Sequence, residues 1–192
     1  MRRKKWIRAF LLAGIALVIA LPASAQLVVI EEEPEVELKY AYGRVKLGFF
    51  MPSNEYVSNT YGTGFTVGLD YFYPLPYRSY GFMGELDYSS MSRSAEGVDK
   101  DWSVTSVGGS FLYFPTRTKE VYIGGGLGYY FMEETIKIGE TESSERKRGV
   151  GFHLRGGYDL GRFFRNFFVE VKISFAGSVK AGGLKIVGGW KF

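Results

Sequence analysis

The chain ends on the stretch Leu184–Phe192, LKIVGGWKF, in which one kind of residue recurs at every second position. One side of this extended segment carries Leu184, Ile186, Gly188, Trp190 and Phe192. Lys185 and Lys191 fall on the other side. Period-two alternation is typical of a β-strand whose two faces meet different surroundings. A final strand of this kind, with no polar tail after it, must pair with another part of the chain.

The same alternation recurs through the chain after residue 39, and glycine and aromatic residues are too frequent there for helices. We predict eight strands, at 40–51, 62–73, 80–91, 102–114, 120–132, 149–160, 166–176 and 183–192. Short links alternate with mostly longer ones, of which 133–148 is the longest. This asymmetry is typical of an up-and-down meander with tight turns at one end. The sequence therefore predicts an all-β fold, an eight-stranded antiparallel up-and-down barrel over residues 40–192.

Charge separates the two faces of these strands. One face of each strand carries no charge, although the fourth strand shows the pattern least clearly. The opposite faces carry Arg44, Lys46, Asp70, Glu85, Asp87, Arg155, Asp159, Glu170, Lys172, Lys185 and Lys191. Buried charges are costly unless they are paired, so we expect these residues to form a mutual ion-pair network that fills the barrel. Gly124, Gly126 and Gly128 share this face and leave room there for arginine or tyrosine side chains from neighbouring strands.

Alternation does not say which face points outward, because a soluble eight-stranded barrel turns its apolar residues inward around a ligand. Three features favour a transmembrane barrel. The charged face includes Phe50, Phe72 and Met83, which suit an interior better than a surface in water. Aromatic residues gather near the strand ends, as membrane-interface girdles do. The third feature is the terminal strand.

The N-terminus has the layout of a secretory signal peptide. A basic start precedes an apolar run from Phe10 to Leu21 and a small-residue exit at residues 23–25. A retained membrane anchor is the other interpretation, but the run is short for a bilayer span of about 20 residues. We predict a signal peptide over 1–25, cleaved after Ala25, and a short periplasmic lead-in over 26–39.

Removal of the signal peptide changes the charge balance. Five of the 24 basic residues lie within it, which leaves 19 against 20 acidic residues and a net charge of −1. The composition therefore gives no ground for nucleic-acid binding. The chain has no cysteine and one histidine, which excludes metal sites of the cysteine type and histidine clusters. We expect no cofactor.

The chain resembles the eight-stranded outer-membrane β-barrel family, of the OmpA transmembrane-domain and OmpX type, over about residues 40–192. The terminal strand carries the resemblance, with Leu184, Ile186, Trp190 and Phe192 in the family's pattern, together with the glycine-aromatic strand VYIGGGLGYYF at 121–131. The resemblance implies that the last strand is a signal read by the barrel-assembly machinery. It also implies a location in the bacterial outer membrane, among its lipids and lipopolysaccharide, as a monomer.

Three functions are compatible with this scaffold. The first is an envelope structural or surface-interaction role through extracellular loops, with an unknown extracellular ligand. The second is a lipid A-modifying enzyme of the deacylase kind, for which His153 is the candidate catalytic residue. The resemblance counts against it, because the deacylase pattern places a serine two residues after the histidine and this chain has Arg155 there. The third is a narrow small-solute pore. In the link 133–148, Arg146, Lys147 and Arg148 are candidates for contact with lipid phosphates.

Overall fold

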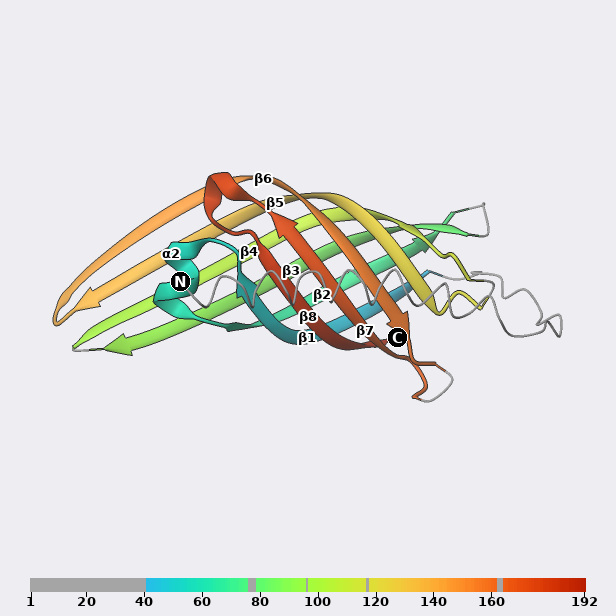
Figure 1. Cartoon of the computed structure of the whole chain (residues 1–192), viewed down its shortest axis with the longest axis horizontal. Helices are drawn as coiled ribbons and strands as arrows, with labels where there is room; N and C mark the ends of the chain where they lie inside the picture. Colours follow the sequence, from blue (N-terminus) through green and yellow to red (C-terminus); the bar gives the residue numbers. More distant parts are fainter. Residues whose placement is uncertain (1–40, 76–78, 96, 117, 162–163) are drawn as a thin grey trace, which may run out of the picture. The chain divides into compact units, whose positions relative to one another are not determined.

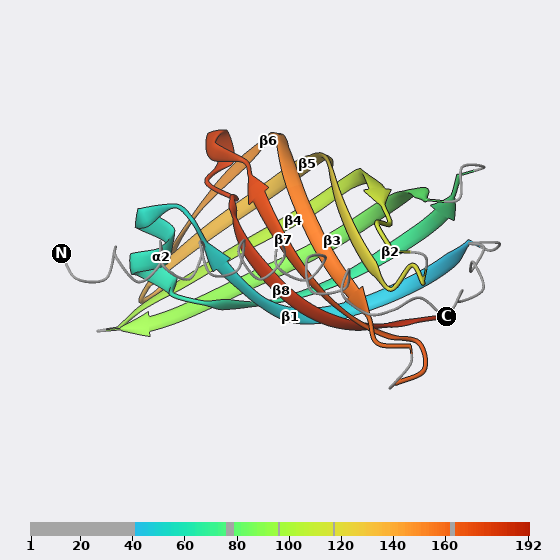
Figure 2. The same cartoon turned by 45° about the vertical axis from the view of Figure 1, so that its right-hand side comes forward.

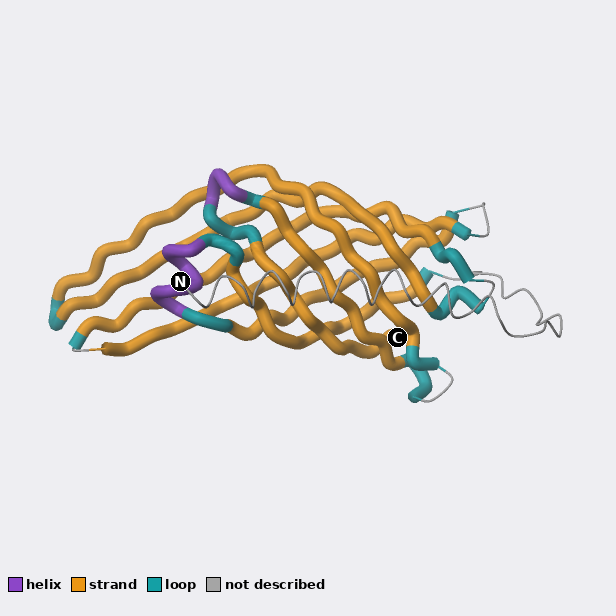
Figure 3. The backbone as a smooth tube through the Cα atoms, in the orientation of Figure 1, coloured by secondary structure: helices purple, strands orange, loops and turns teal. Residues whose placement is uncertain are grey.

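The protein is described by a computed structural model that covers residues 41–75, 79–95, 97–116, 118–161 and 164–192. Eight strands form one closed antiparallel barrel in chain order, as Figure 1 and the tube in Figure 3 show. The strands are β1 (Tyr42–Pro52), β2 (Gly64–Pro74), β3 (Tyr80–Ala95), β4 (Val98–Tyr113), β5 (Val121–Ile138), β6 (Thr141–Asp159), β7 (Phe167–Phe175) and β8 (Gly183–Lys191). The predicted fold is therefore confirmed. The predicted signal peptide and lead-in lie outside the described residues.

The last strand closes the barrel against the first. Register runs from Arg44 opposite Lys191 to Pro52 opposite Gly183. Beyond the ladder, Gly43 and Phe192 exchange both backbone hydrogen bonds at 3.0 Å. This pairing closes the cylinder and uses the backbone groups of the final strand, which removes the sheet edge.

The barrel has two different ends. The connections from β2 to β3, from β4 to β5 and from β6 to β7 begin and end where β1 begins and β8 ends, which we call the turn end. The opposite end carries the helix α2 (Glu55–Tyr61), between β1 and β2, and the short helix η2 (Gly177–Val179), between β7 and β8. We call this the α2 end; Figure 2 shows α2 beside the projecting tips of the β3–β4 pair.

Two of the predicted long links are strands instead. β3 and β4 stay paired to Ala95 opposite Val98, and β5 and β6 to Ile138 opposite Thr141. Gly97 and Gly139, at φ 77° and 58°, allow the tight turns. The prediction of a loop over 133–148 was wrong because charged residues resemble a loop in sequence, whereas cross-strand backbone bonding continues regardless of side-chain polarity.

Side chains alternate between a buried inner face and an exposed outer face. Leu47 and Leu127 on the outer face are 69% and 65% exposed, although each is a large apolar residue in mid-strand. An apolar outer band of this kind is the mark of a barrel surrounded by lipid. No helix among the described residues is long and apolar enough to cross a bilayer.

The interior is filled in three layers. An apolar cluster at the turn end contains Phe72, Met83, Leu112, Phe114 and Tyr122. A second apolar cluster at the α2 end includes Phe50, Trp102 and Met132 from the barrel and Val57, Tyr61 and Val179 from α2 and η2. The charged residues lie between these two layers. The helices at the α2 end thus complete the packing of the interior.

Candidate functional site

The middle layer brings together nine of the eleven predicted charges. Asp70, Glu85, Asp87 and Glu170 supply four carboxylates, and Arg44, Lys46, Arg155, Lys172 and Lys185 supply five cations. The side chain of each is at most 5% exposed. Within a water-poor interior each charge must find partners inside the protein, because the hydration it loses is otherwise uncompensated.

Each carboxylate of this layer pairs with more than one cation. Glu85 receives hydrogen bonds from Arg155 and from the Lys172 ammonium, the latter at 2.7 Å. Asp87 accepts from Lys172 at 3.0 Å and Lys185 at 3.1 Å. Shared partners of this kind make the layer one network. The loss of one member therefore leaves several other charged groups without a counter-charge.

Arg44 forms the junction with the aromatic layer at the turn end. Its Nη2 lies 2.6 Å from Asp70 and 2.7 Å from Glu170, and its Nη1 donates to the Tyr122 hydroxyl at 2.8 Å. The ring of Phe168 lies 3.9 Å from the guanidinium carbon. Planar geometry lets one arginine meet two carboxylates, a hydroxyl and an aromatic face at once, which a lysine cannot do.

The network also contains the one acidic group among the described residues that could hold a metal ion. Oxygen atoms of Asp70, Glu85 and Asp87 all lie within 4.8 Å of one another. The Lys46 ammonium lies 2.7 Å from Asp70 and 2.9 Å from Asp87, and Lys172 lies 2.7 Å from Glu85. Because ammonium groups already supply the positive charge, the arrangement suits an ion-pair network better than a metal centre.

Two glycines let side chains meet across an intervening strand. Gly68 of β2 stands between Lys46 and Asp87 in register, and a Cβ there would lie 2.3 Å from the Asp87 carboxylate. Gly157 of β6 stands in the same way between Tyr122 and Glu170, whose side chains are joined by a 2.7 Å hydrogen bond. A missing side chain in the middle strand thus creates the space that the neighbouring polar groups occupy.

Replacing Gly157 with valine should therefore lower the free energy of unfolding by about 1–3 kcal/mol, the usual cost of overpacking a filled interior. A Cβ at Gly157 would lie 2.2 Å from the Tyr122 ring. The ring must then move, and its hydroxyl loses its hydrogen bonds with Glu170 and Arg44. Urea unfolding from lipid vesicles measures the change. Gly84→Val is the matched control, because a Cβ at Gly84 meets nothing within 4 Å. Equal destabilisation of both variants would contradict this explanation.

The remaining two predicted charges lie apart from the network. Asp159 and Lys191 form an ion pair with each other at the turn end, where their side chains are 23% and 20% exposed. Their strands end here, so the inner face opens toward solvent. The expectation that these two belong to one network with the others was wrong for this positional reason.

His153 lies within the network and is 1% exposed. Its Nε2 lies 2.7 Å from the Ser110 hydroxyl and 3.0 Å from a Glu85 oxygen. A Ser-His-acid triad needs the serine and the acid on opposite ring nitrogens. Here both share Nε2, and Nδ1 is a buried atom with no hydrogen-bond partner among the described residues. Sequence parity did not single out Ser110, because it assigned the side of the fourth strand that carries Trp102, Ser110 and Leu112 to the uncharged outer face, whereas the structure turns that side inward.

A second buried carboxylate, Glu134, organises the α2 end. It is 6% exposed and accepts hydrogen bonds from the hydroxyls of Tyr56 at 2.9 Å and Tyr61 at 2.8 Å, both from α2. Burial and this hydrogen bond raise the pKa of Tyr61 well above its usual range. The hydrogen bond to Glu134 also raises the pKa of Tyr56. Glu134 was not among the predicted site residues because residue 134 was expected to lie in a loop.

The three basic residues of the β5–β6 hairpin lie in different settings. Arg146 pairs with Glu133 at 2.8 Å on the outer face. Lys147 lies on the opposite face of β6 and pairs with Glu145 at 2.8 Å. Arg148 is exposed on the outer face opposite Phe131, and no ion pair of its side chain is found among the described residues. Arg148 thus differs from the other two, because it is an exposed cation beside the outer-face ring of Phe131.

The terminal strand presents the predicted pattern to the outside. Ile186 and Trp190 are 45% and 48% exposed, and Leu184 is half-buried on the same face. Phe192 is 73% exposed and lies against Gly43, where a Cβ would approach its ring to 2.6 Å. Lys185 on the other face reaches the interior network.

Comparisons with known proteins agree with this geometry. The model of the family described as "Outer membrane protein beta-barrel domain" matches residues 12–180. Two structures of Ail, the attachment invasion locus protein of Yersinia pestis, are similar, with 14% identity, 82% of this chain and 100% of the other covered, and TM-scores of 0.56 and 0.59. The second is a complex with the heparin analogue sucrose octasulfate. The N-terminal β-barrel domain of Pseudomonas aeruginosa OprF matches at 12% identity, with 79% and 97% coverage and a TM-score of 0.48. No curated protein matches the sequence.

Proposed function

The chain belongs to the outer membrane protein β-barrel domain family, and from that premise we propose that it acts at the cell surface through the sheet that projects from its α2 end. In such barrels the short turns face the periplasm and the longer connections face outward. The turn end, where β1 begins and β8 ends, is then periplasmic. The α2 end and the two long hairpins are extracellular.

The observation that carries this proposal is an unpaired strand edge. Pairing of β6 with β7 begins only at Phe152 opposite Phe175, whereas pairing of β6 with β5 extends to Thr141. Among the described residues, no strand therefore lies on the second side of 141–151 in β6. The segment around η2 packs against Gly149 and Gly151. This leaves 141–148 as the free edge, which projects beyond α2 in Figure 1.

The backbone groups along this edge can be assigned. Asp159 donates its backbone N–H toward β5, to Glu120, and Leu160 donates toward β7, to Phe167. Register is constant along β5–β6, so even-numbered residues of β6 direct their N–H and C=O groups away from β5. Glu142, Ser144, Arg146 and Arg148 thus line the free edge with unpaired backbone donors and acceptors. Such an edge is a template for the addition of an extended segment from a partner.

The chemistry of the projecting sheet favours a polypeptide partner over a sulfated polysaccharide. The likeness to Ail concerns the fold, so the sucrose octasulfate bound by that protein does not transfer to this one. In this chain Arg146 and Lys147 are each paired with a glutamate, and Lys137 lies 3.4 Å from Glu142. Pairing removes the cationic excess that a polyanion requires, while the backbone edge stays available.

Two other functions have less support. Catalysis on lipid A lacks a triad geometry, since Ser110 and Glu85 share one nitrogen of His153 inside the barrel. A solute pore needs a continuous free path, and two apolar layers and a charged layer occupy the interior. We infer a non-enzymatic barrel with a filled interior that serves as a rigid anchor for the extracellular sheet.

The remaining assignments follow from this topology as proposals. Residues 1–25 are a cleaved signal peptide, 26–39 a periplasmic lead-in and 40–192 the barrel, which works as a monomer. Leu184, Ile186, Trp190 and Phe192 form the signal for the barrel-assembly machinery. Arg148, beside Phe131 on the outer face, contacts lipopolysaccharide phosphates.

Surface labelling tests the orientation. The chain contains no cysteine, so a single introduced thiol reports one position without background. Ser144→Cys should react with a membrane-impermeant maleimide on intact cells. Thr118→Cys, at the turn end, should react only after the outer membrane is permeabilised. The opposite order of reactivity would overturn the proposed orientation.

Proline substitution tests the free edge. Ser144→Pro removes one outward N–H without breaking the β5–β6 ladder, since proline is tolerated on edge strands when its N–H position faces solvent. Peptides selected from a random displayed library on the nanodisc-embedded barrel should bind Ser144→Pro at least about tenfold more weakly. They should bind Ser144→Ala normally. Equal binding to both variants would show that the edge is not the docking site.

A further inference from the structure

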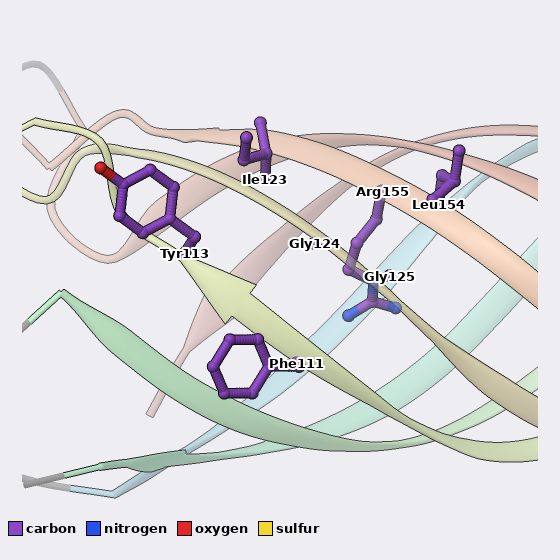
Figure 4. Close-up of a pocket in the computed structure, with 7 residues that line it drawn as sticks. All are labelled: Phe111, Tyr113, Ile123, Gly124, Gly125, Leu154 and Arg155. Carbon is purple, nitrogen blue, oxygen red and sulfur yellow. The ribbon is translucent and has the colours of Figure 1, made fainter. Parts of the chain in front are cut away.

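The outer face carries a groove at the β4–β5–β6 junction, near the turn end. It has a volume of about 450 Å³ and is lined by Phe111, Tyr113, Ile123, Gly124, Gly125, Leu154 and Arg155. Figure 4 shows these residues, with Arg155 directed away from the side on which Ile123 and Leu154 stand. Phe111, Gly125 and Leu154 stand in one cross-strand row, and Tyr113 and Ile123 are opposite each other in the adjoining row.

The groove exists because Gly125 has no side chain among large neighbours. A Cβ at Gly125 would lie 3.1 Å from Leu154 Cδ2, which is tighter than ordinary contact. Tyr80 packs against both Phe111 and Tyr113, with ring centroids at 5.4 Å and 5.3 Å. Two rings of this three-ring cluster, Phe111 and Tyr113, form one wall of the groove, and Tyr80 holds them in place. The opposite wall is formed by Ile123 and Leu154, so the depression is a built feature with two firm sides.

The lining determines what the groove accepts. The guanidinium of Arg155, under the floor, is already bonded to Glu85 and lies 3.4 Å from Glu170, so no free charge is offered outward. Water in a cavity needs two to four polar partners, which the apolar walls do not supply. A hydrocarbon chain in the groove makes dispersion contacts with both walls, and these contacts are absent when the groove is empty.

We propose that this groove is a binding site for one acyl chain of a phospholipid. It is continuous with the apolar band that faces the bilayer. In the orientation proposed above, on which this assignment rests, its position beside the turn end places it in the periplasmic leaflet, which consists of phospholipid, whereas lipopolysaccharide occupies the outer leaflet. The Tyr113 ring at the end of β4 lies where interfacial aromatic side chains meet headgroups.

Native mass spectrometry of the full barrel, extracted in mild detergent from the outer membrane, tests the site. The natural chain and Gly84→Leu, which adds bulk to the same outer face where a Cβ meets nothing within 4 Å, should each retain one phospholipid. Gly125→Leu, which fills the groove, and Leu154→Ala, which removes a wall, should each retain about tenfold less. Heat-modifiable mobility checks the folding of each variant, and Leu154→Ala decides the question if Gly125→Leu fails to fold.

Three results would overturn the proposal. One is equal lipid retention in the natural chain and Leu154→Ala. Another is a retained lipid with the mass of lipopolysaccharide. The third is a dimer mass that Gly125→Leu abolishes, which would show that a second copy occupies the groove. None of these results depends on the free edge of β6, so this test and the peptide-binding test can fail separately.

Discussion

Replacing Glu85 with glutamine should lower the free energy of unfolding by about 3–5 kcal/mol, the range observed when one partner of a buried ion pair is removed. Glu85 is the shared acceptor of Arg155 and Lys172 and lies 3.0 Å from His153. The side chain of glutamine has nearly the same shape but no charge. The loss in the free energy of unfolding therefore measures the cost of leaving two buried cations without full charge compensation.

Urea unfolding from lipid vesicles, followed by tryptophan fluorescence, gives the measurement. Glu142→Gln is the matched control, because Glu142 pairs with Lys137 at 3.4 Å while 57% exposed. Exposed pairs contribute about 0–1 kcal/mol, so this variant should unfold almost as the natural chain does. If the two variants lost equal stability, the interior charges would not act as a buried network.

Replacing Leu127 with arginine should cost about 2–4 kcal/mol, the penalty for a cation on the lipid face near the bilayer midplane. Leu127 is 65% exposed, in the middle of the outer row of β5. In water such a position would accept arginine with little effect. A cost of this size would therefore show that hydrocarbon, and not water, surrounds the barrel at this position.

The same unfolding experiment measures this change. Ser144→Arg places an equal charge on the outer face of the projecting β5–β6 hairpin, near its tip and far from the middle of the strands, and should change stability little. The difference between the two positions is the result of interest. If Leu127→Arg left the free energy of unfolding unchanged, this would indicate that water surrounds the middle of the strands.

The fold was predictable because a barrel wall separates two environments along every strand. Parity sorted Lys46 and Asp70 to one face and Leu47 and Leu69 to the other, and the structure buries the first pair and exposes the second. Strand ends were harder to predict. Beyond the membrane both faces of the β5–β6 hairpin meet water, so the alternation that identifies a strand is lost while its backbone pairing continues.

The partners within the site could not be predicted from parity. Lys46 meets Asp87 across Gly68, which requires knowledge of the register of three strands. Glu134 meets Tyr61 through α2, a seven-residue helix capped by the side chain of Asn54, which accepts from the Val57 N–H at 3.3 Å. So short a helix has no periodicity that a sequence reading can detect.

The most direct test is the accessibility of spin labels placed singly at Leu47, Leu69 and Leu127 in a bilayer, in a chain that has no cysteine of its own. All three side chains are exposed on the outer face in mid-strand. Each label should collide readily with oxygen, which concentrates in hydrocarbon, and rarely with a water-soluble nickel chelate. Preferential collision with the chelate at these three sites would show that the apolar face does not meet lipid, and the account would be wrong.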